Sequence, residues 1–173
     1  ALVLESEALT DAEPAALRRA MLTGVRQLGL EALPWTRELR DRQARLLSVR
    51  DWFPAEGWPE LSDSWLAGHL AEWLELWLDG ITRREHLARL DLAAALESLL
   101  DRRLSSRLND LAPTYLTVPS GSRIRLQYAP GQSPVLAVKL QELFGLADTP
   151  RIAEGRVAVT LHLLSPAQRP IQV

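Results

Sequence analysis

The spacing of apolar residues changes at Pro113, and this change constrains the fold more than any other feature of the sequence. Before Pro113 the apolar residues recur at intervals of three and four, which is typical of helices. After Pro113 they alternate with polar residues, which is typical of strands. The sequence therefore predicts an α+β chain. About five helices are expected over residues 1–112, and over residues 113–173 a small, mostly antiparallel sheet with one helix packed on it.

The first two helices have recognisable starts or faces. Thr10 and Glu13 can form a capping box, Pro14 suits the first helical turn, and Gly29 offers an end. A second helix is expected over residues 36–52. Arginines and carboxylates at salt-bridge spacing mark one side of it, and such a side is typically solvated.

The strongest helical pattern lies over residues 65–78, where a tryptophan or histidine followed by leucine repeats every four residues. This repeat predicts one continuous helix with a broad apolar side, ending at Gly80. A capping box at Thr82 predicts a short helix through Leu90. Asp91 is expected to cap a further helix that continues to Leu111.

In the second part, residues 119–122 (PSGS) predict a hairpin turn between strands at 115–118 and 123–128. Ser133 and Pro134 read as a helix cap followed by proline at the first position, so a helix is expected over residues 133–144. The strand at 156–164 is apolar on both faces and is therefore expected in the middle of the sheet.

The chain lacks the residue patterns that most catalytic sites require. The chain has no cysteine, and its single lysine, Lys139, is not part of a glycine-rich phosphate loop. His69, His86 and His162 are far apart in sequence, and His162 with nearby Ser165 lacks a nucleophile elbow. No apolar run approaches the ~20 residues that span a bilayer. We therefore predict no catalytic residue, no metal site, no cofactor of the chain's own and no membrane partner.

The charge distribution favours a binding surface in the second part. The chain as a whole has a net charge of −2, but residues 119–173 hold six basic and three acidic residues. Arg123 and Arg125 share one face of a strand, a placement suited to a phosphate backbone. With Arg156 and Arg169 they are the candidate nucleic-acid-binding residues. The alternative is an ordinary solvated sheet face, because 19 of the 20 basic residues are arginine, as in many GC-rich genomes.

Three blocks in order along the chain, TVPSGSRI (117–124), LAVKLQELFG (136–145) and LLSPAQRP (163–170), resemble the C-terminal region of HrpB-type bacterial helicases. These are ATP-dependent DExH/DEAH-box proteins. The resemblance implies a parent with two RecA-like motor domains followed by winged-helix, helical-bundle and OB-like domains. Its ATP and magnesium sites would lie upstream, residues 1–9 would end the OB-like domain, and the C-terminus would be truncated.

The resemblance implies a non-catalytic accessory domain of a cytoplasmic RNA helicase. Its expected partners are the helicase core of the same polypeptide and single-stranded RNA. Whether the chain counts as an enzyme depends on the parent, since this part carries no catalytic motif. The alternative is a protein-interaction or structural platform that binds no nucleic acid, with Ser165 and Gln168 as candidate partner contacts.

Overall fold

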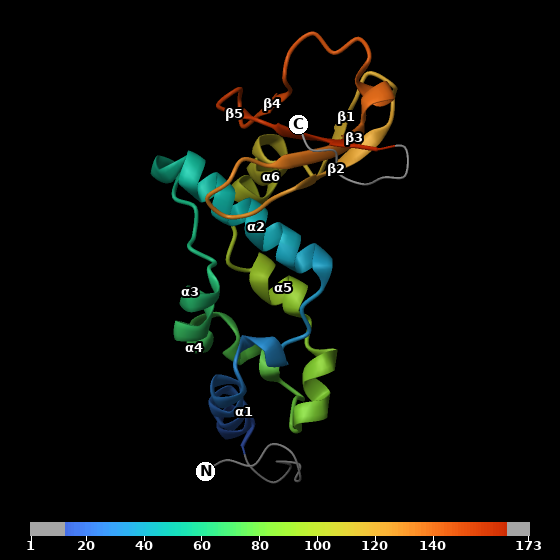
Figure 1. The fold of residues 1–173 in the computed structure, drawn as a ribbon. Helices are drawn as coiled ribbons and strands as arrows, with labels where there is room; N and C mark the ends of the chain where they lie inside the picture. Colours follow the sequence, from blue (N-terminus) through green and yellow to red (C-terminus); the bar gives the residue numbers. More distant parts are fainter. Residues whose placement is uncertain (1–12, 166–173) are drawn as a thin grey trace. The chain divides into compact units, whose positions relative to one another are not determined.

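The computed structural model describes residues 13–165, and over this range it confirms the α+β class. Helices and short 3-10 helices (η) precede Tyr115, and from Tyr115 onward the elements are strands with one 3-10 helix among them (Figure 1). The helical elements are α1 Pro14–Leu28, η1 Leu30–Ala32, α2 Arg37–Trp52, η2 Pro54–Glu56, α3 Asp63–Gly68, α4 Leu70–Trp73, η3 Glu75–Leu78, η4 Arg84–Arg89, α5 Leu92–Glu97 and α6 Arg102–Leu111. The remaining elements are β1 Tyr115–Thr117, β2 Arg123–Gln127, β3 Val135–Lys139, η5 Leu140–Leu143, β4 Arg151–Ile152, β5 Val157–Ala158 and β6 Thr160–Leu164.

Several helix starts and ends lie where the sequence predicts them. Pro14 is at the start of α1, and Gly29 ends it with a φ of +90° while its N–H donates to the Val25 carbonyl (2.8 Å). The Asp91 carboxylate caps α5 by accepting from the amide of Ala94 (3.0 Å). The expected capping residue Thr10 and the expected domain end at 1–9 lie outside the described residues.

The continuous helix expected over residues 65–78 is wrong, because the segment divides into α3, α4 and η3. Its own side chains bind the carbonyls that a helix would use. The His69 ring hydrogen-bonds the Trp65 carbonyl through Nδ1 (2.7 Å), and Trp73 Nε1 donates to the Leu66 carbonyl (2.9 Å). The leucines of the repeat still face the core, since Leu74 is 0% and Leu78 1% exposed.

Two other helical predictions also need correction. The segment after Thr82 is the 3-10 helix η4, and Thr82 donates its N–H to His86 Nδ1 (3.3 Å) in place of a capping box. The long helix expected from Asp91 to Leu111 is interrupted between α5 and α6. The Ser98 hydroxyl donates to the Ala95 carbonyl (2.6 Å), and such local bonds compete with helix continuation.

The larger sheet has the order β1-β2-β3-β6, with antiparallel pairs β1–β2 and β2–β3 and the parallel pair β3–β6. β4 and β5 form a separate antiparallel pair. The helix expected over 133–144 is wrong, since the apolar run at 135–138 pairs on both sides as β3 and η5 follows it. Leu136 is 0% exposed and Val138 1%, so burial and strand pairing override the Ser-Pro cap signal. Among the described residues β6 lies at one end of this order, so the interior position expected for it is wrong, and β2 and β3 are the interior strands.

The hairpin turn at residues 119–122 is confirmed. The Gly121 N–H donates to the Val118 carbonyl (2.8 Å), and the Val118 N–H donates to the Ser122 carbonyl (3.0 Å). Gly121 has a φ of +94°, a conformation that favours glycine. The turn sets a register in which Thr117 pairs with Arg123 and Tyr115 with Arg125.

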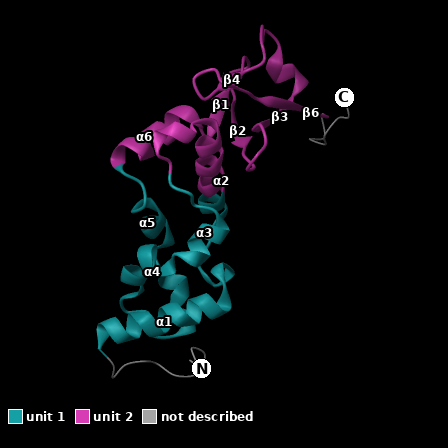
Figure 2. Cartoon of the chain, turned by 90° about the vertical axis from the view of Figure 1, so that its left-hand side faces the viewer, with its two compact units in different colours: residues 1–40, 59–101 teal, residues 41–58, 102–173 magenta. Residues whose placement is uncertain are grey.

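The chain divides into two compact units, each built from two segments (Figure 2). Unit 1 comprises residues 1–40 and 59–101, and unit 2 comprises residues 41–58 and 102–173. In unit 2, α6 and residues 41–52 of α2 lie on one side of the larger sheet (Figures 1 and 2). Over residues 13–165, no helix has the length and apolar character needed to cross a membrane.

Candidate nucleic-acid interface

Two arginines and a tyrosine form a cluster on the outer face of the β1–β2 hairpin. Because strand side chains alternate, Arg123 and Arg125 project from the same face of β2, as the sequence predicted. The register places Tyr115 of β1 beside them. Arg123 Cζ lies 4.7 Å and Arg125 Cζ 5.8 Å from the centroid of the Tyr115 ring. We call these three residues the arginine–tyrosine cluster.

The two arginines of the cluster differ in their electrostatic surroundings. Arg125 lies 3.6 Å from the carboxylate of Asp41 on α2, and its side chain is 30% exposed. Arg123 is exposed, and no carboxylate of the described residues lies within ion-pair distance of it. Asp41 therefore partly neutralises and holds Arg125, whereas Arg123 presents its charge to solvent.

The hairpin turn next to the cluster is held in place by η5. The Ser122 hydroxyl donates to the Glu142 carboxylate (2.8 Å), and the Ser120 N–H donates to the Glu142 carbonyl (3.2 Å). Two apolar side chains at this end of the sheet are exposed, Leu140 at 52% and Phe144 at 71%. The cluster thus projects from a braced hairpin beside an exposed apolar surface.

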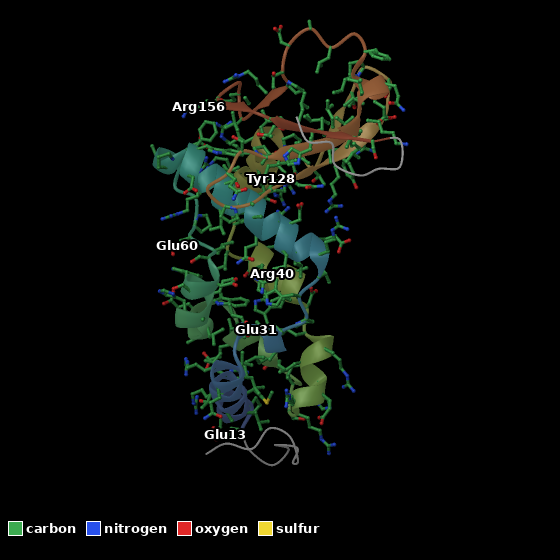
Figure 3. All side chains as sticks on the ribbon, in the orientation of Figure 1. Glu13, Glu31, Arg40, Glu60, Tyr128 and Arg156 are labelled. Atoms are coloured by element: carbon green, nitrogen blue, oxygen red, sulfur yellow. The ribbon has the colours of Figure 1, made fainter. Side chains whose placement is uncertain are left out.

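Arg156 does not join the cluster. Its guanidinium lies 4.3 Å from the centre of the Phe53 ring and donates to the Trp52 carbonyl (3.3 Å), at the end of α2. Asp41 and Trp52 are eleven residues apart in α2, or about 16 Å along the helix axis. The candidate arginines therefore occupy two places in unit 2, one at each end of this part of α2. Arg156 is labelled in Figure 3.

The remaining candidates follow β6. Ser165 is half-buried and comes directly after that strand. Gln168 and Arg169 lie outside the described residues. Across residues 13–165, no group of three histidine, aspartate or glutamate side chains is placed to hold a metal ion.

Sequence reasoning assigned Arg45 to a solvated helix face, yet it is only 5% exposed. Arg45 Nε donates to the Ala112 carbonyl (2.7 Å), and Nη2 donates to Asn109 Oδ1 (2.9 Å). The Tyr128 hydroxyl (Figure 3) donates to the next carbonyl, that of Pro113 (2.6 Å). Burial lowers the pKa of Arg45 and raises that of Tyr128. One sequence feature could have pointed to a buried donor such as Arg45. The last carbonyls of a helix need hydrogen-bond donors, and no glycine follows α6 to cap them.

Arg107 was a second residue that the sequence did not single out. From α6 it donates two hydrogen bonds to Glu56 (2.7 and 2.6 Å) and one to Glu154 (2.9 Å). The Arg107 hydrogen bond lowers the pKa of Glu56, and the same bond raises the pKa of Arg107. It also lies 5.6 Å from the Phe53 ring centre, so Arg107 connects η2, α6 and the β4–β5 turn.

Comparison with known proteins agrees with the sequence resemblance. Residues 73–173 match the family model HrpB_C, described as ATP-dependent helicase C-terminal. The chain is 44% identical over 157 residues to the ATP-dependent RNA helicase HrpB of Escherichia coli K12, an alignment that covers 91% of this chain and 19% of the relative.

Two solved structures from E. coli also match. The crystal structure of the DExH-box NTPase HrpB superposes with a TM-score of 0.87 at 43% identity, covering 95% of this chain and 20% of that one. The crystal structure of the DEAH/RHA helicase HrpB gives a TM-score of 0.83 at 40% identity, covering 96% and 21%. This chain therefore spans about a fifth of each of these relatives. It belongs to the HrpB_C family, the C-terminal part of HrpB-type ATP-dependent helicases.

Proposed function

We propose that the chain is a non-catalytic accessory part of a cytoplasmic ATP-dependent RNA helicase and that its arginine–tyrosine cluster contacts single-stranded RNA. The curated relative is an ATP-dependent RNA helicase, and this chain corresponds to a C-terminal segment of it. In this proposal the chain packs on the helicase core of the same polypeptide. ATP and magnesium are bound by that core.

The observation that carries the RNA contact is the placement of Arg123 and Arg125 around Tyr115. Guanidinium groups neutralise phosphates, and aromatic rings stack on bases without selecting a sequence. A helicase that moves along a strand needs this kind of sequence-independent contact. Tyr115 is 40% exposed, so its side chain can be reached from solvent.

The test is fluorescence anisotropy of a labelled oligouridylate with the 173-residue chain, titrated at several salt concentrations. The wild-type affinity is expected to fall as salt rises. Each phosphate contact to a single strand contributes about −0.7 to the slope of log K against log salt. Arg123→Ala/Arg125→Ala should therefore reduce that slope by up to ~1.4. Tyr115→Ala should weaken binding by ~5- to 150-fold, the range for one lost stacking contact.

The matched control is Arg19→Ala/Arg26→Ala, which removes two exposed arginines from α1 and changes the net charge equally. This control should retain wild-type affinity and salt slope. If both double variants lose the same affinity, the binding is unspecific charge attraction and the cluster is not a site. If Arg123→Ala/Arg125→Ala binds as the wild type does, the proposed RNA contact is refuted.

The exposed side chains of Leu140 and Phe144 favour a second candidate, a platform for protein contact. Under this alternative, the helicase core expressed as a separate polypeptide would co-purify with the chain in the presence of nuclease. Leu140→Ser/Phe144→Ser would abolish that co-purification, and Arg123→Ala/Arg125→Ala would leave it intact. RNA affinity would then be negligible.

A further inference from the structure

The open face of the larger sheet extends the arginine–tyrosine cluster across all four strands. Cross-strand partners share a face, and the register can be followed from strand to strand. Arg125 pairs with Tyr115, Gln127 with Val135, and Ala137 with His162. Alternation along β2 and β3 then places Arg123 and Lys139 on the same face as Tyr115 and His162.

The two faces of this sheet differ in burial. Leu126 and Leu136, which pair across β2 and β3, are 0% exposed and form the core face. On the opposite face His162 is exposed and Lys139 is half-exposed.

The charged residues that the four strands place on the open face are all basic. The described strands β1, β2, β3 and β6 contain no aspartate or glutamate. Two carboxylates contact the hairpin: Asp41, which faces Arg125 from α2, and Glu142, which is bonded to Ser122 in the turn. Arg123 and Lys139 are therefore free of carboxylates on their own face, which suits a polyanion.

We propose that single-stranded RNA crosses this open face from β1 to β6, with Arg123 and Lys139 on phosphates and Tyr115 and His162 stacked on bases. Three strand spacings of ~4.8 Å give a path of about 14 Å, which about four nucleotides span at a stacked rise of ~3.4 Å. Because this inference rests on the proposed RNA contact of the cluster, it adds Lys139 and His162 as binding residues. It also predicts a footprint wider than the hairpin.

A length series of oligouridylates, from two to twelve nucleotides, tests the path with the 173-residue chain. Lys139→Ala/His162→Ala should weaken binding of the longer oligonucleotides by at least ~5-fold, the lower limit for one lost stack. It should leave the shortest one nearly unchanged, because the hairpin alone can hold it. Arg26→Ala, which also removes one charge, should match the wild type at every length.

The outcomes separate the two proposals. If Arg123→Ala/Arg125→Ala weakens binding but Lys139→Ala/His162→Ala does not at any length, the crossing path is refuted and the hairpin contact stands. If the wild-type chain binds no oligonucleotide, both proposals are refuted. Crosslinking of a 4-thiouridine oligonucleotide uses the wild-type chain alone, so its result does not depend on whether a variant folds. Peptides containing Tyr115 and His162 should both carry the label, and label confined to unit 1 would overturn the path.

Discussion

Replacement of Arg45 by alanine tests how unit 2 is held together. The Arg45 guanidinium is buried and donates to Ala112 and Asn109, near the end of α6. Alanine removes both bonds and leaves the carbonyl of Ala112, a fully buried residue, without its donor. The arginine side chain also fills volume between α2 and α6. We therefore expect a large and local loss of stability.

The magnitude follows from the number and type of bonds. A hydrogen bond from a charged group contributes about 1.5–3 kcal/mol, and two are lost. Allowing for water that enters the vacated space, Arg45→Ala should cost about 3–5 kcal/mol of the ~5–15 kcal/mol that stabilises a domain. Arg45→Lys keeps the charge and one bond, so about half of that loss is expected.

Native-state hydrogen exchange measures this loss separately in each unit. The Leu126 amide, bonded to the Thr114 carbonyl (2.9 Å), reports on unit 2, and the Leu74 amide, bonded to Leu70 (2.9 Å), reports on unit 1. Protection of Leu126 should fall by about 150- to 5,000-fold in Arg45→Ala, with Leu74 nearly unchanged. Arg37→Ala, an exposed position on α2, should alter stability by less than ~0.5 kcal/mol. A loss in unit 2 below ~1 kcal/mol would refute the role given to Arg45.

Two further predictions concern Glu56 and Gly121. The lowered pKa of Glu56 means that its contribution to stability is present above its ordinary value of 4.5 and disappears as pH falls toward the folded-state value. The urea midpoint should therefore decline more steeply below that pH in the wild type than in Glu56→Gln, and parallel declines would contradict the Arg107 contact. Gly121→Ala should destabilise the hairpin by ~1–2 kcal/mol, because Gly121 has a positive φ that alanine rarely adopts. The control Gly68→Ala should not destabilise the chain, because the φ of Gly68 is ordinary. Equal urea midpoints for the two variants would count against this reasoning.

Local signals predicted those parts of the fold that depend on local interactions. The end of α1 at Gly29, the Asp91 cap and the turn around Gly121 each involve residues within about one helical turn or one hairpin. The shared face of Arg123 and Arg125 also follows from strand alternation alone. Tyr115 as their neighbour requires the register as well, so two of the three cluster residues were within reach of the sequence.

The sequence predictions that were wrong concern segments whose structure depends on residues far away in the sequence. The segment at 135–139 carries helix-cap residues at its start, but pairing with β2 and β6 decides its structure. Arg45 has the spacing of a surface salt-bridge residue, and its burial is explained by the Ala112 carbonyl and Asn109 Oδ1, which are 67 and 64 residues away. Asp41 beside Arg125 and Trp52 beside Arg156 are tertiary contacts of the same kind. Periodicity carries no information about such contacts.

The interleaving of the two units limits how the molecule can be shortened. The polypeptide passes from one unit to the other at residues 40/41, 58/59 and 101/102. Any uninterrupted fragment that holds all of unit 2 must also carry residues 59–101. A sheet expressed from Pro113 onward would lose the guanidinium of Arg45 from its border and the Trp52 carbonyl that anchors Arg156. A minimal version of unit 2 must therefore be spliced, with a linker joining residue 58 to residue 102, and cannot be obtained by trimming the ends.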